Sequence, residues 1–346
     1  MNDAAGTRCT GPASERGSVA LFFVMFLIPL LSFGALAIDI AWVATVRNQL
    51  QNAADAAALA AADAMMSPTG GPLNWSQAAP AANGVIAQNS AAGAALSTGS
   101  VTTGYWNVTR NPASMQPTTI TPGAYDVPAV QVTVSRAPGV NGGSIPLLLG
   151  GLLGIPGTSG SATAIAVLAA PGEVAAGGLF PIAIDQCVYN QYWNAVTNQP
   201  LINPLTGQPF EFSITNGQTY GALCMGGQWT SFQSTATDTT TMSGLMVTGN
   251  PTTLNIGDSI NLATGVKATL YTSVPVGATV VLPVVTQTSS STTVPIVAFA
   301  AFHIDVSLGG TYKYIQGHFV AGVKLTGVAT GVGPYYGVYV PPRLAL

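Results

Sequence analysis

The feature that most constrains this chain is an uninterrupted apolar run near its N-terminus. Val19 to Ile38 reads VALFFVMFLIPLLSFGALAI and contains no charged side chain. At a rise of ~1.5 Å per residue, a helix of this length just crosses a hydrocarbon core of ~30 Å. Pro29 is compatible with such a helix, because neighbouring groups in a bilayer can satisfy the freed carbonyl. The run therefore predicts one transmembrane helix.

The charges around this run favour a cytoplasmic N-terminus. Arg8 and Arg16 precede it, and the next basic residue is Arg47. A secretory signal with cleavage after residues 35–37, Ala-Leu-Ala, is the competing interpretation and would leave a soluble product beginning at Ile38. We favour an uncleaved anchor, because the apolar run is longer than the ~7–15 residues of a signal-peptide core.

The segment after Asp39 is rich in Ala and is expected to continue the helix outward to Ser67-Pro68. Apolar positions recur there at steps of three and four, and a polar row follows steps of four. We predict that Arg47, Leu50, Gln51 and Asp55 form a helix-packing or assembly face. The alternative is that the helix packs only on its own domain. The other apolar positions are Val43, Val46, Ala53 and Ala57.

Asp39 is the one acidic residue beside the apolar run. A proton relay would need ionisable partners inside the span, and the sequence has none there. We therefore expect a hydrated carboxylate at the membrane interface.

The composition favours an exported, β-rich body. Charged residues make up 6% of the chain and apolar residues 48%, while 40 Gly and 24 Pro imply many turns. The net charge of −3 is thinly spread, and the exported part has no basic run that could follow a phosphate backbone. We therefore expect no nucleic-acid partner.

Strand-like segments follow the helix. We predict strands at 101–108, 129–134 and 161–169, a short helix around 78–88, and a buried turn or helix at 145–155. From residue 179 onward, short apolar runs between Gly, Pro and Thr indicate a sandwich or barrel-like β domain. These runs are 180–184, 243–247, 266–272, 279–284, 295–305 and 312–323. Tyr335, Tyr336 and Tyr339 are expected to close this core; an exposed contact patch is the alternative.

The predicted fold class is α+β. A single N-terminal transmembrane helix continues into a long helix packed on a small antiparallel sheet, in a pilin-like arrangement, and a mainly-β sandwich or barrel-like domain follows. The predicted segments are a cytoplasmic N-terminus at 1–18, the membrane and extended helix at 19–66, a pilin-like α/β unit at 67–172 and a β-rich exported domain at 173–346.

Cys187 and Cys224 lie on the same side of the apolar run, whereas Cys9 precedes it. In an oxidising compartment these two can pair, with an entropic stabilisation of roughly 3–4 kcal/mol. Two separate buried thiols are the alternative.

No catalytic or metal-binding pattern is evident in the sequence. His303 and His318 are expected to pack or to face solvent, since Asp305 and Cys224 supply no recognised ligand spacing. The glutamates Glu173 and Glu211 and the scattered aspartates do not suggest paired-carboxylate chemistry. We therefore predict no enzymatic activity, no metal and no cofactor.

The sequence Arg16-Gly17-Ser18-Val19-Ala20, the apolar run, and above all the phrase RNQLQNAADAAALA at 47–60 resemble the N-terminal module of TadE/TadG-like Flp-pilus assembly proteins. The resemblance is most specific over residues 16–66, and segments 104–107, 129–136 and 161–168 extend it. It implies a single-pass protein of the bacterial inner membrane, with a cytoplasmic N-terminus and a periplasmic bulk. It also implies a role in the assembly or anchoring of a Tad-type pilus or a related secretion apparatus.

Two family features do not transfer to this chain. The prepilin-peptidase signal requires Glu at the fifth mature position, where Phe22 stands after Gly17, so we do not expect processing into a pilus subunit. The Asp-x-Ser-x-Ser motif of a von Willebrand A domain is also lacking; Asp305-Val306-Ser307 comes nearest.

Three functional hypotheses follow, in order of preference. The first is a membrane-anchored scaffold that contacts other pilus-assembly or envelope proteins, with self-association through the helix as an open question. The second is a surface adhesin or carbohydrate-binding β domain on an anchor. The third is a secreted enzyme, which would need Asp or His side chains converging in a cleft.

Overall fold

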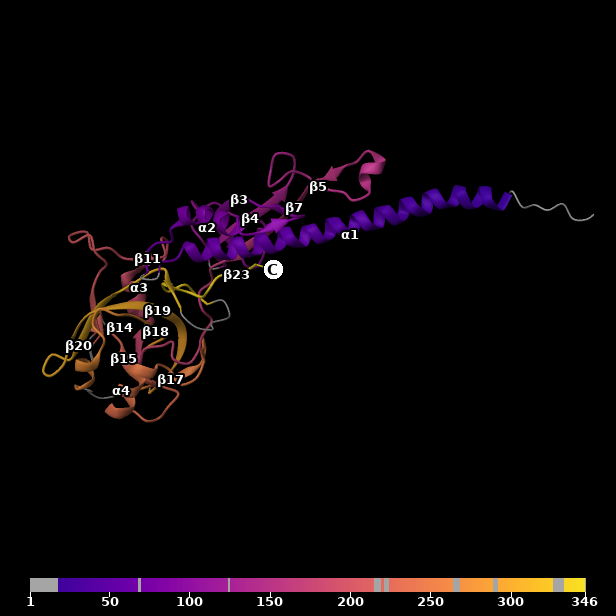
Figure 1. Ribbon diagram of the computed structural model, residues 1–346. Helices are drawn as coiled ribbons and strands as arrows, with labels where there is room; N and C mark the ends of the chain where they lie inside the picture. Colours follow the sequence, from indigo (N-terminus) through magenta and orange to yellow (C-terminus); the bar gives the residue numbers. More distant parts are fainter. Residues whose placement is uncertain are drawn as a thin grey trace, which may run out of the picture.

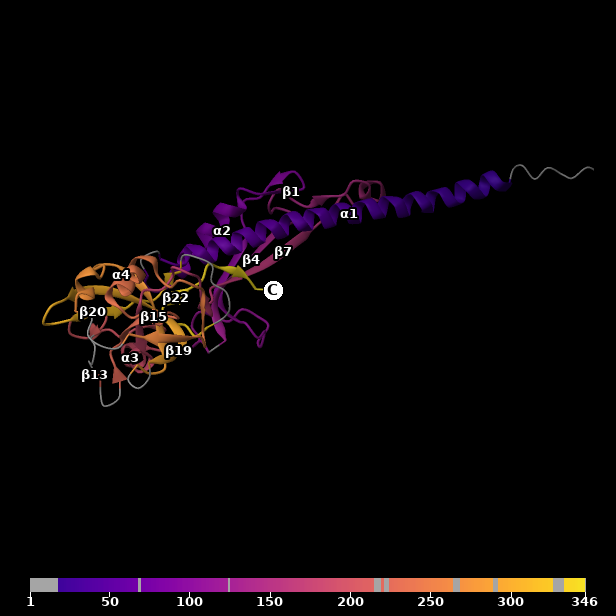
Figure 2. The ribbon, with the colours of Figure 1, turned by 90° about the horizontal axis from the view of Figure 1, so that it is seen from below.

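The computed structural model describes residues 18–67, 70–123, 125–214, 219–220, 224–263, 268–288, 292–325 and 333–345. One long helix leads into a body built mainly of β-strands, and the helix extends well beyond this body on one side (Figures 1 and 2). The fold class is α+β with a β-rich C-terminal part, as predicted. The expected cytoplasmic segment lies, except for Ser18, outside the described residues.

Helix α1 runs without a break from Ser18 to Ala64. The apolar run forms its first part and the Ala-rich segment its second, and Pro29 is accommodated inside the helix. Ala is the best helix former and the second part contains neither Gly nor Pro, so the backbone continues regularly past Asp39. At ~1.5 Å per residue, 47 residues give a rod of roughly 70 Å.

The second part of α1 packs on an antiparallel sheet with the strand order β23-β7-β4-β3. The strands are β3 (Ser100–Asn107), β4 (Asp126–Arg136), β7 (Gly160–Val167) and β23 (Arg343–Leu344). In β4, Val130, Val132 and Val134 are fully buried and alternate with half-buried polar residues, as expected for a strand with one face on a helix. The strands predicted near 101, 129 and 161 are thus present.

Small side chains allow α1 to lie close to this sheet. Six fully buried alanines of α1 share the contact: Ala53, Ala54, Ala57, Ala58, Ala61 and Ala62. Gly160 of β7 makes room for Ile145 of the neighbouring hairpin, because a Cβ there would lie 2.7 Å from Cδ1 of Ile145. Leu50 packs nearby and is completely buried. The short elements around the helix are η1 (Trp75–Gln77), α2 (Ala78–Ile86), β1 (Ser90–Ala91) and β2 (Ala94–Ala95).

The segment at 145–155 is not the buried turn or helix that the sequence suggested. It forms a hairpin of β5 (Ile145–Pro146) and β6 (Gly157–Thr158) with the short helix η2 (Gly150–Leu153) at its tip. Leu148 is 60% exposed and Ile155 56% exposed. The apolar composition led to the expectation of burial, but the hairpin projects along α1 away from the sheet (Figure 1).

The C-terminal part is a closed arrangement of strands. Pairings run β19–β17–β15–β9–β18 and return from β18 to β19, with β20 and β12 added beside β19. This ring is barrel-like, as predicted. The long strand β19 (Thr293–Leu308) holds three neighbours at once. The other main strands are β9 (Ile182–Asp185), β12 (Phe212–Ile214), β15 (Gln228–Phe232), β17 (Ser259–Leu262), β18 (Thr279–Val285) and β20 (Tyr314–Phe319).

Two of the apolar runs assigned to strands are helical. Residues 243–247 belong to α4 (Thr239–Thr248), because the Asp238 side chain accepts from the backbone N–H groups of Thr240 and Thr241 and caps the helix. Of the run 266–272, the last three residues belong to the short helix η3 (Leu270–Ser273). Residues 266–267 lie outside the described residues. The remaining elements are β8 (Glu173–Val174), α3 (Gln186–Tyr192), β10 (Trp193–Asn194), β11 (Gln199–Pro200), β13 (Thr219–Tyr220), β14 (Cys224–Met225), β16 (Leu254–Asn255), β21 (Val323–Lys324) and β22 (Val338–Tyr339).

The chain returns from the barrel-like part to the first sheet. Tyr336 stacks on Tyr189 in the barrel core at 3.7 Å, and Tyr339 is buried in the core between α1 and its sheet. Beyond Tyr339, β23 pairs with β7. The predicted role in closing the core of the β domain holds for Tyr336, with Tyr335 packed against it, whereas Tyr339 belongs to the core between α1 and its sheet. The C-terminal strand therefore belongs to the same sheet as the unit expected at 67–172.

Leu50→Ala is expected to lower the free energy of unfolding by about 2–5 kcal/mol, because Leu50 is completely buried against a close-packed sheet. Urea unfolding of the detergent-solubilised chain, followed by tryptophan fluorescence, measures this change. The control is Asn52→Ala on the exposed side of the same helix. Equal losses for both variants would contradict the assignment of Leu50 to the core.

Candidate functional site

The first part of α1 has no protein partner within the described residues. Apart from Leu27, which is half-buried, its large apolar side chains from Leu21 to Ile38 are between 50% and 72% exposed. An 18-residue window there has a mean hydropathy of 2.6 and no buried residue, which makes α1 the one described helix long and apolar enough to cross a membrane. The exposed residues are Leu21, Phe22, Phe23, Val24, Met25, Phe26, Ile28, Leu30, Leu31, Phe33, Leu36 and Ile38.

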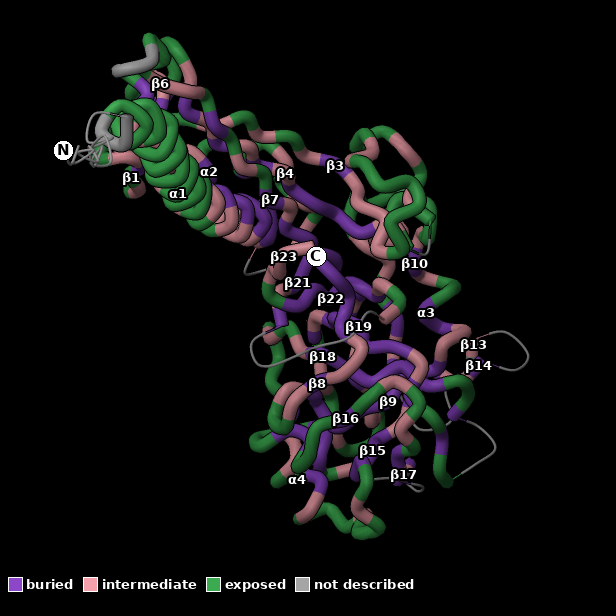
Figure 3. Tube along the Cα trace, turned by 90° about the vertical axis from the view of Figure 1, so that its right-hand side faces the viewer, coloured by how far each residue is buried: buried purple, intermediate pink, exposed green. Residues whose placement is uncertain are grey.

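Exposure changes along α1, from mostly exposed at its N-terminal end to buried where it packs on the sheet (Figure 3). Asp39 is only 6% exposed and Ile40 is still 61% exposed, whereas Val46 and Leu50 are completely buried. The helix therefore has two environments along one backbone. From Leu21 to Ile38 no residue is buried, whereas one side of the later part belongs to the core of the body.

Asp39 is not the hydrated carboxylate that the sequence suggested. Its Oδ1 accepts hydrogen bonds from the backbone N–H groups of Leu148 at 2.7 Å and Leu149 at 3.1 Å. A carboxylate that accepts backbone amides is well satisfied without water. The hairpin at 145–158 thus covers Asp39, which explains its burial.

Trp42 makes a second contact to this hairpin one turn further along α1. Its indole Nε1 donates to the carbonyl oxygen of Pro146 at 2.9 Å. Trp is enriched where a membrane helix leaves the hydrocarbon, since its ring is apolar and its N–H is polar. The sequence analysis did not single out Trp42, although its position after an uncharged run was the available signal.

The four residues of the predicted assembly face have different surroundings. Leu50 is buried in the core of its own unit, and Arg47 is exposed. Gln51 donates to Asp55 at 2.7 Å and to the carbonyl oxygen of Thr163 at 3.3 Å. The structure thus joins Gln51 and Asp55 to the sheet and leaves Arg47, one turn earlier on the helix, exposed. A contact with another protein through this face stays a prediction.

The end of α1 is tied to the barrel-like part. Lys324 forms an ion pair with Asp63, and Ser67 bridges to Val323. The amide of Gly71 also donates to the carbonyl oxygen of Ala321. These contacts connect the helix mechanically to the C-terminal body.

Cys187 and Cys224 form a disulfide bond between α3 and β14. The bridge closes a sequence separation of 37 residues. Disulfides persist in oxidising compartments such as the bacterial periplasm.

The two histidines lie together on the barrel surface. His303 and His318 are cross-strand partners on β19 and β20, and Asp305 accepts from Nδ1 of His318 at 2.7 Å. The second Asp305 oxygen lies 3.8 Å from Nε2 of His303. Sequence spacing did not reveal this cluster, because His318 reaches it only through the pairing of β20 with β19. No group of three His, Cys, Asp or Glu suited to a metal ion occurs among the described residues.

Asp185 is a buried carboxyl at the start of α3. Its Oδ2 accepts from the backbone N–H of Thr288 at 3.2 Å. Burial raises the pKa of Asp185, although hydrogen bonds from backbone amides counteract this rise. Asp185 lines neither of the cavities below, so its environment points to a structural role.

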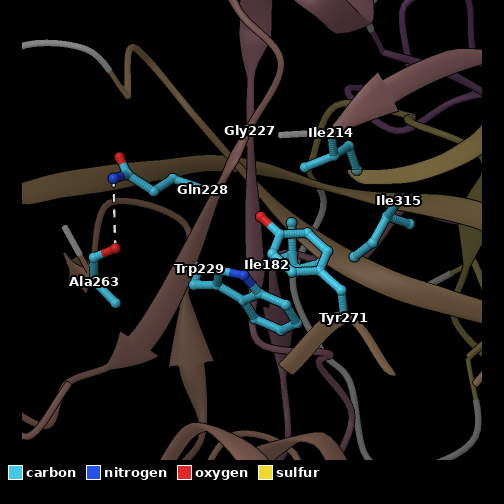
Figure 4. Close-up of a pocket in the computed structure, with 8 residues that line it drawn as sticks. All are labelled: Ile182, Ile214, Gly227, Gln228, Trp229, Ala263, Tyr271 and Ile315. Atoms are coloured by element: carbon cyan, nitrogen blue, oxygen red, sulfur yellow. Dashed lines mark hydrogen bonds between the residues drawn. The ribbon is translucent and has the colours of Figure 1, made fainter. Parts of the chain in front are cut away.

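A small cavity inside the barrel-like part has room for about one water molecule. It measures about 10 Å³ and lies among Ile182, Ile214, Trp229 and Tyr271 (Figure 4). The side chain of Gln228 beside it donates to the carbonyl oxygen of Ala263. The walls are largely apolar, and the space is too small for a substrate.

A larger cleft of about 730 Å³ lies where the first sheet, the β10–β11 hairpin and the C-terminal segment meet. Trp75, Tyr105, Tyr125 and Tyr335 contribute aromatic surface to it. Its volume is in the range of ligand pockets, ~300–1,000 Å³. Burial raises the pKa of Tyr335 to about 12.

Comparison with protein families identifies the N-terminal part of the chain. Residues 17–64 match a family described as putative Flp pilus-assembly, TadE/G-like. Residues 41–166 match a second, described as putative Tad-like Flp pilus-assembly. No curated protein and no solved structure matches the chain.

The fold thus defines an α+β protein in which a long apolar N-terminal helix carries a small sheet and a β-rich C-terminal part. Over residues 17–166 the chain matches models of TadE/G-like and Tad-like Flp pilus-assembly families, which confirms the resemblance seen in the sequence. It therefore carries the domains of a pilus-assembly component. These are assembly domains, whereas residues 167–346 lie beyond both matches.

Cys187→Ala combined with Cys224→Ala is expected to lower the free energy of unfolding by roughly 4 kcal/mol, because the bridge restricts the unfolded chain. Urea unfolding of the native chain and of the double variant measures the difference. In the native chain, alkylation without reductant followed by intact mass should label Cys9 alone. Three labelled thiols would contradict the bridge.

The buried tyrosine Tyr335 predicts a pH dependence at alkaline pH. Its unfolded pKa lies near 10 and its folded pKa is about 12, so stability is fully present below pH 10 and is lost as pH rises towards 12. Tyr335→Phe should flatten this part of the stability–pH curve in urea titrations. Tyr125→Phe is the control, because Tyr125 is 60% exposed. An unchanged curve for Tyr335→Phe would contradict the expected shift.

Proposed function

We propose that this protein is a membrane-anchored assembly component of a Tad-type (Flp) pilus or a related secretion apparatus. The observation that carries the proposal is the two environments of α1: exposed and uncharged to Ile38, buried in its own sheet from Val46 onward. A bilayer would cover the first part, and the second part would hold the body at a fixed height above it.

The proposed orientation places the N-terminus in the cytoplasm and the body in the periplasm. The disulfide bond between Cys187 and Cys224 supports this orientation, because cytoplasmic thiols are usually kept reduced. The uncharged apolar span also supports an inner-membrane location with a single pass. The body would then contact other pilus-assembly or envelope proteins as a scaffold.

The anchor is tested by cell fractionation and intact mass after expression in a Gram-negative host. We expect a full-length chain that stays in the carbonate-washed membrane and becomes protease-sensitive when the outer membrane is permeabilised. Phe26→Arg should release part of the chain, since a cation near the middle of the span costs about 2.5–3.5 kcal/mol on insertion scales. Val247→Arg on exposed α4 is the matched control. A soluble product beginning at Ile38 would contradict the anchor.

The aromatic cleft favours a second candidate, a surface adhesin or carbohydrate-binding domain on the same anchor. The exposed ring of Tyr125 at its edge is suited to stacking on a sugar face. A strain that lacks this protein distinguishes the two proposed functions. Loss of pili supports the assembly role, whereas intact pili with lost adhesion support the adhesin.

A further inference from the structure

The hairpin at residues 145–158 is an apolar projection that reaches the proposed membrane boundary. No charged residue occurs between Arg136 and Glu173, and the hairpin reads IPLLLGGLLGIPGT. Among its described side chains, Pro146, Leu148, Ile155 and Pro156 are exposed. Its two ends pair with each other, and Leu147 donates to the carbonyl oxygen of Pro156.

The level of the tip along α1 is set by contacts. Asp39 accepts from the amides of Leu148 and Leu149 near the tip. Trp42, one turn further along α1, donates to Pro146 in β5. Leu50 lies further still along the helix, near Gly160 of β7. The hairpin therefore points along α1 towards the N-terminal end (Figures 1 and 2). Its tip stands beside Asp39, directly after the uncharged run.

The hairpin is also held at its base. Arg136 is only 3% exposed, and its guanidinium donates to the carbonyl oxygens of Gly142 at 2.8 Å and Gly143 at 3.1 Å. It also donates to Ala91 at 2.7 Å. With Asp39 accepting from the tip and Arg136 donating to the base, the position of the hairpin is defined from both sides.

We propose that this hairpin inserts its tip into the headgroup–acyl boundary of the same bilayer that α1 spans. This inference rests on the proposed anchor. If residues 19–38 fill the hydrocarbon core, the amides of Leu148 and Leu149 lie at its outer edge. The exposed side chains of Leu148 and Ile155 then meet lipid in place of water, as the apolar face of an interfacial segment does.

The lipid surface is the occupant that fits these observations. The tip is continuous with the exposed apolar surface of α1, it carries no charge, and Trp42 lies at the same level with an interfacial residue type. Asp39 acts as a positioning residue: it satisfies two backbone N–H groups of the tip, which would otherwise need water or lipid carbonyls. Two membrane contacts would fix the tilt and rotation of the body, which one helix alone leaves free.

Spin labels measure the immersion directly. We would label single cysteines in the full chain with Cys9→Ser, at Phe33→Cys in the span, Leu148→Cys in the tip and Leu205→Cys in the body. Leu205 is the control, since it is 93% exposed. The chain is placed in vesicles of phosphatidylethanolamine and phosphatidylglycerol, and power-saturation EPR compares collisions with oxygen and with a nickel chelate.

We expect oxygen to dominate at Phe33 and Leu148 and the nickel chelate at Leu205. If oxygen dominates at Phe33 but the nickel chelate dominates at Leu148, as at Leu205, the hairpin proposal is wrong and the anchor still holds. A Phe33 label in water would overturn both. A Leu148 label hidden from both reagents would show a protein contact at the tip and would also overturn lipid insertion.

Asp39→Ala tests the positioning role. In this variant the Leu148 label should lose immersion and gain mobility, while the Phe33 label stays immersed. Asp55→Ala is the matched control on the same helix and should leave both labels unchanged. If the Leu148 label keeps its immersion and its line shape in Asp39→Ala, the hydrogen bonds to Asp39 do not position the tip.

Discussion

Helix α1 is a single hydrogen-bonded rod that passes from an exposed environment into a protein core, and the other elements are arranged around this passage. A helix satisfies its own backbone groups, so it can continue through both environments without a break. The side chains differ between the two parts of the helix. Large apolar residues cover the part before Asp39, and small alanines face the sheet after it. Close approach of helix and sheet follows from the alanines, and the exposed rod follows from the uncharged run.

The C-terminal segment makes one body of the two β-rich parts. β23 completes the sheet beneath α1, and shortly before it Tyr336 and Tyr339 belong to two different cores. The Asp63–Lys324 ion pair joins the end of α1 to the barrel-like part. A partly exposed ion pair contributes little to stability, so these links position the parts mainly through the buried tyrosines and the strand pairing.

The groups with chemical potential are spread over the molecule. The His303–Asp305–His318 cluster lies on the barrel surface, Asp185 is buried beside α3, and the large cleft is lined chiefly by aromatic and small residues. His303, Asp305, His318 and Asp185 line neither the small cavity nor the large cleft.

Sequence alone determined the local properties of this protein. The uncharged run and the Ala-rich segment specify one long helix, valine alternation specifies β4, and the phrase at 47–60 specifies the family. Only the tertiary structure decided what depends on distant contacts. The hairpin at 145–158 covers Asp39, the pairing of β19 with β20 brings His318 beside His303 and Asp305, and β23 returns to the first sheet. Composition and periodicity report the preferences of neighbouring residues, whereas these contacts join residues far apart in the chain. Their free energy comes from packing and hydrogen bonds that exist only after folding.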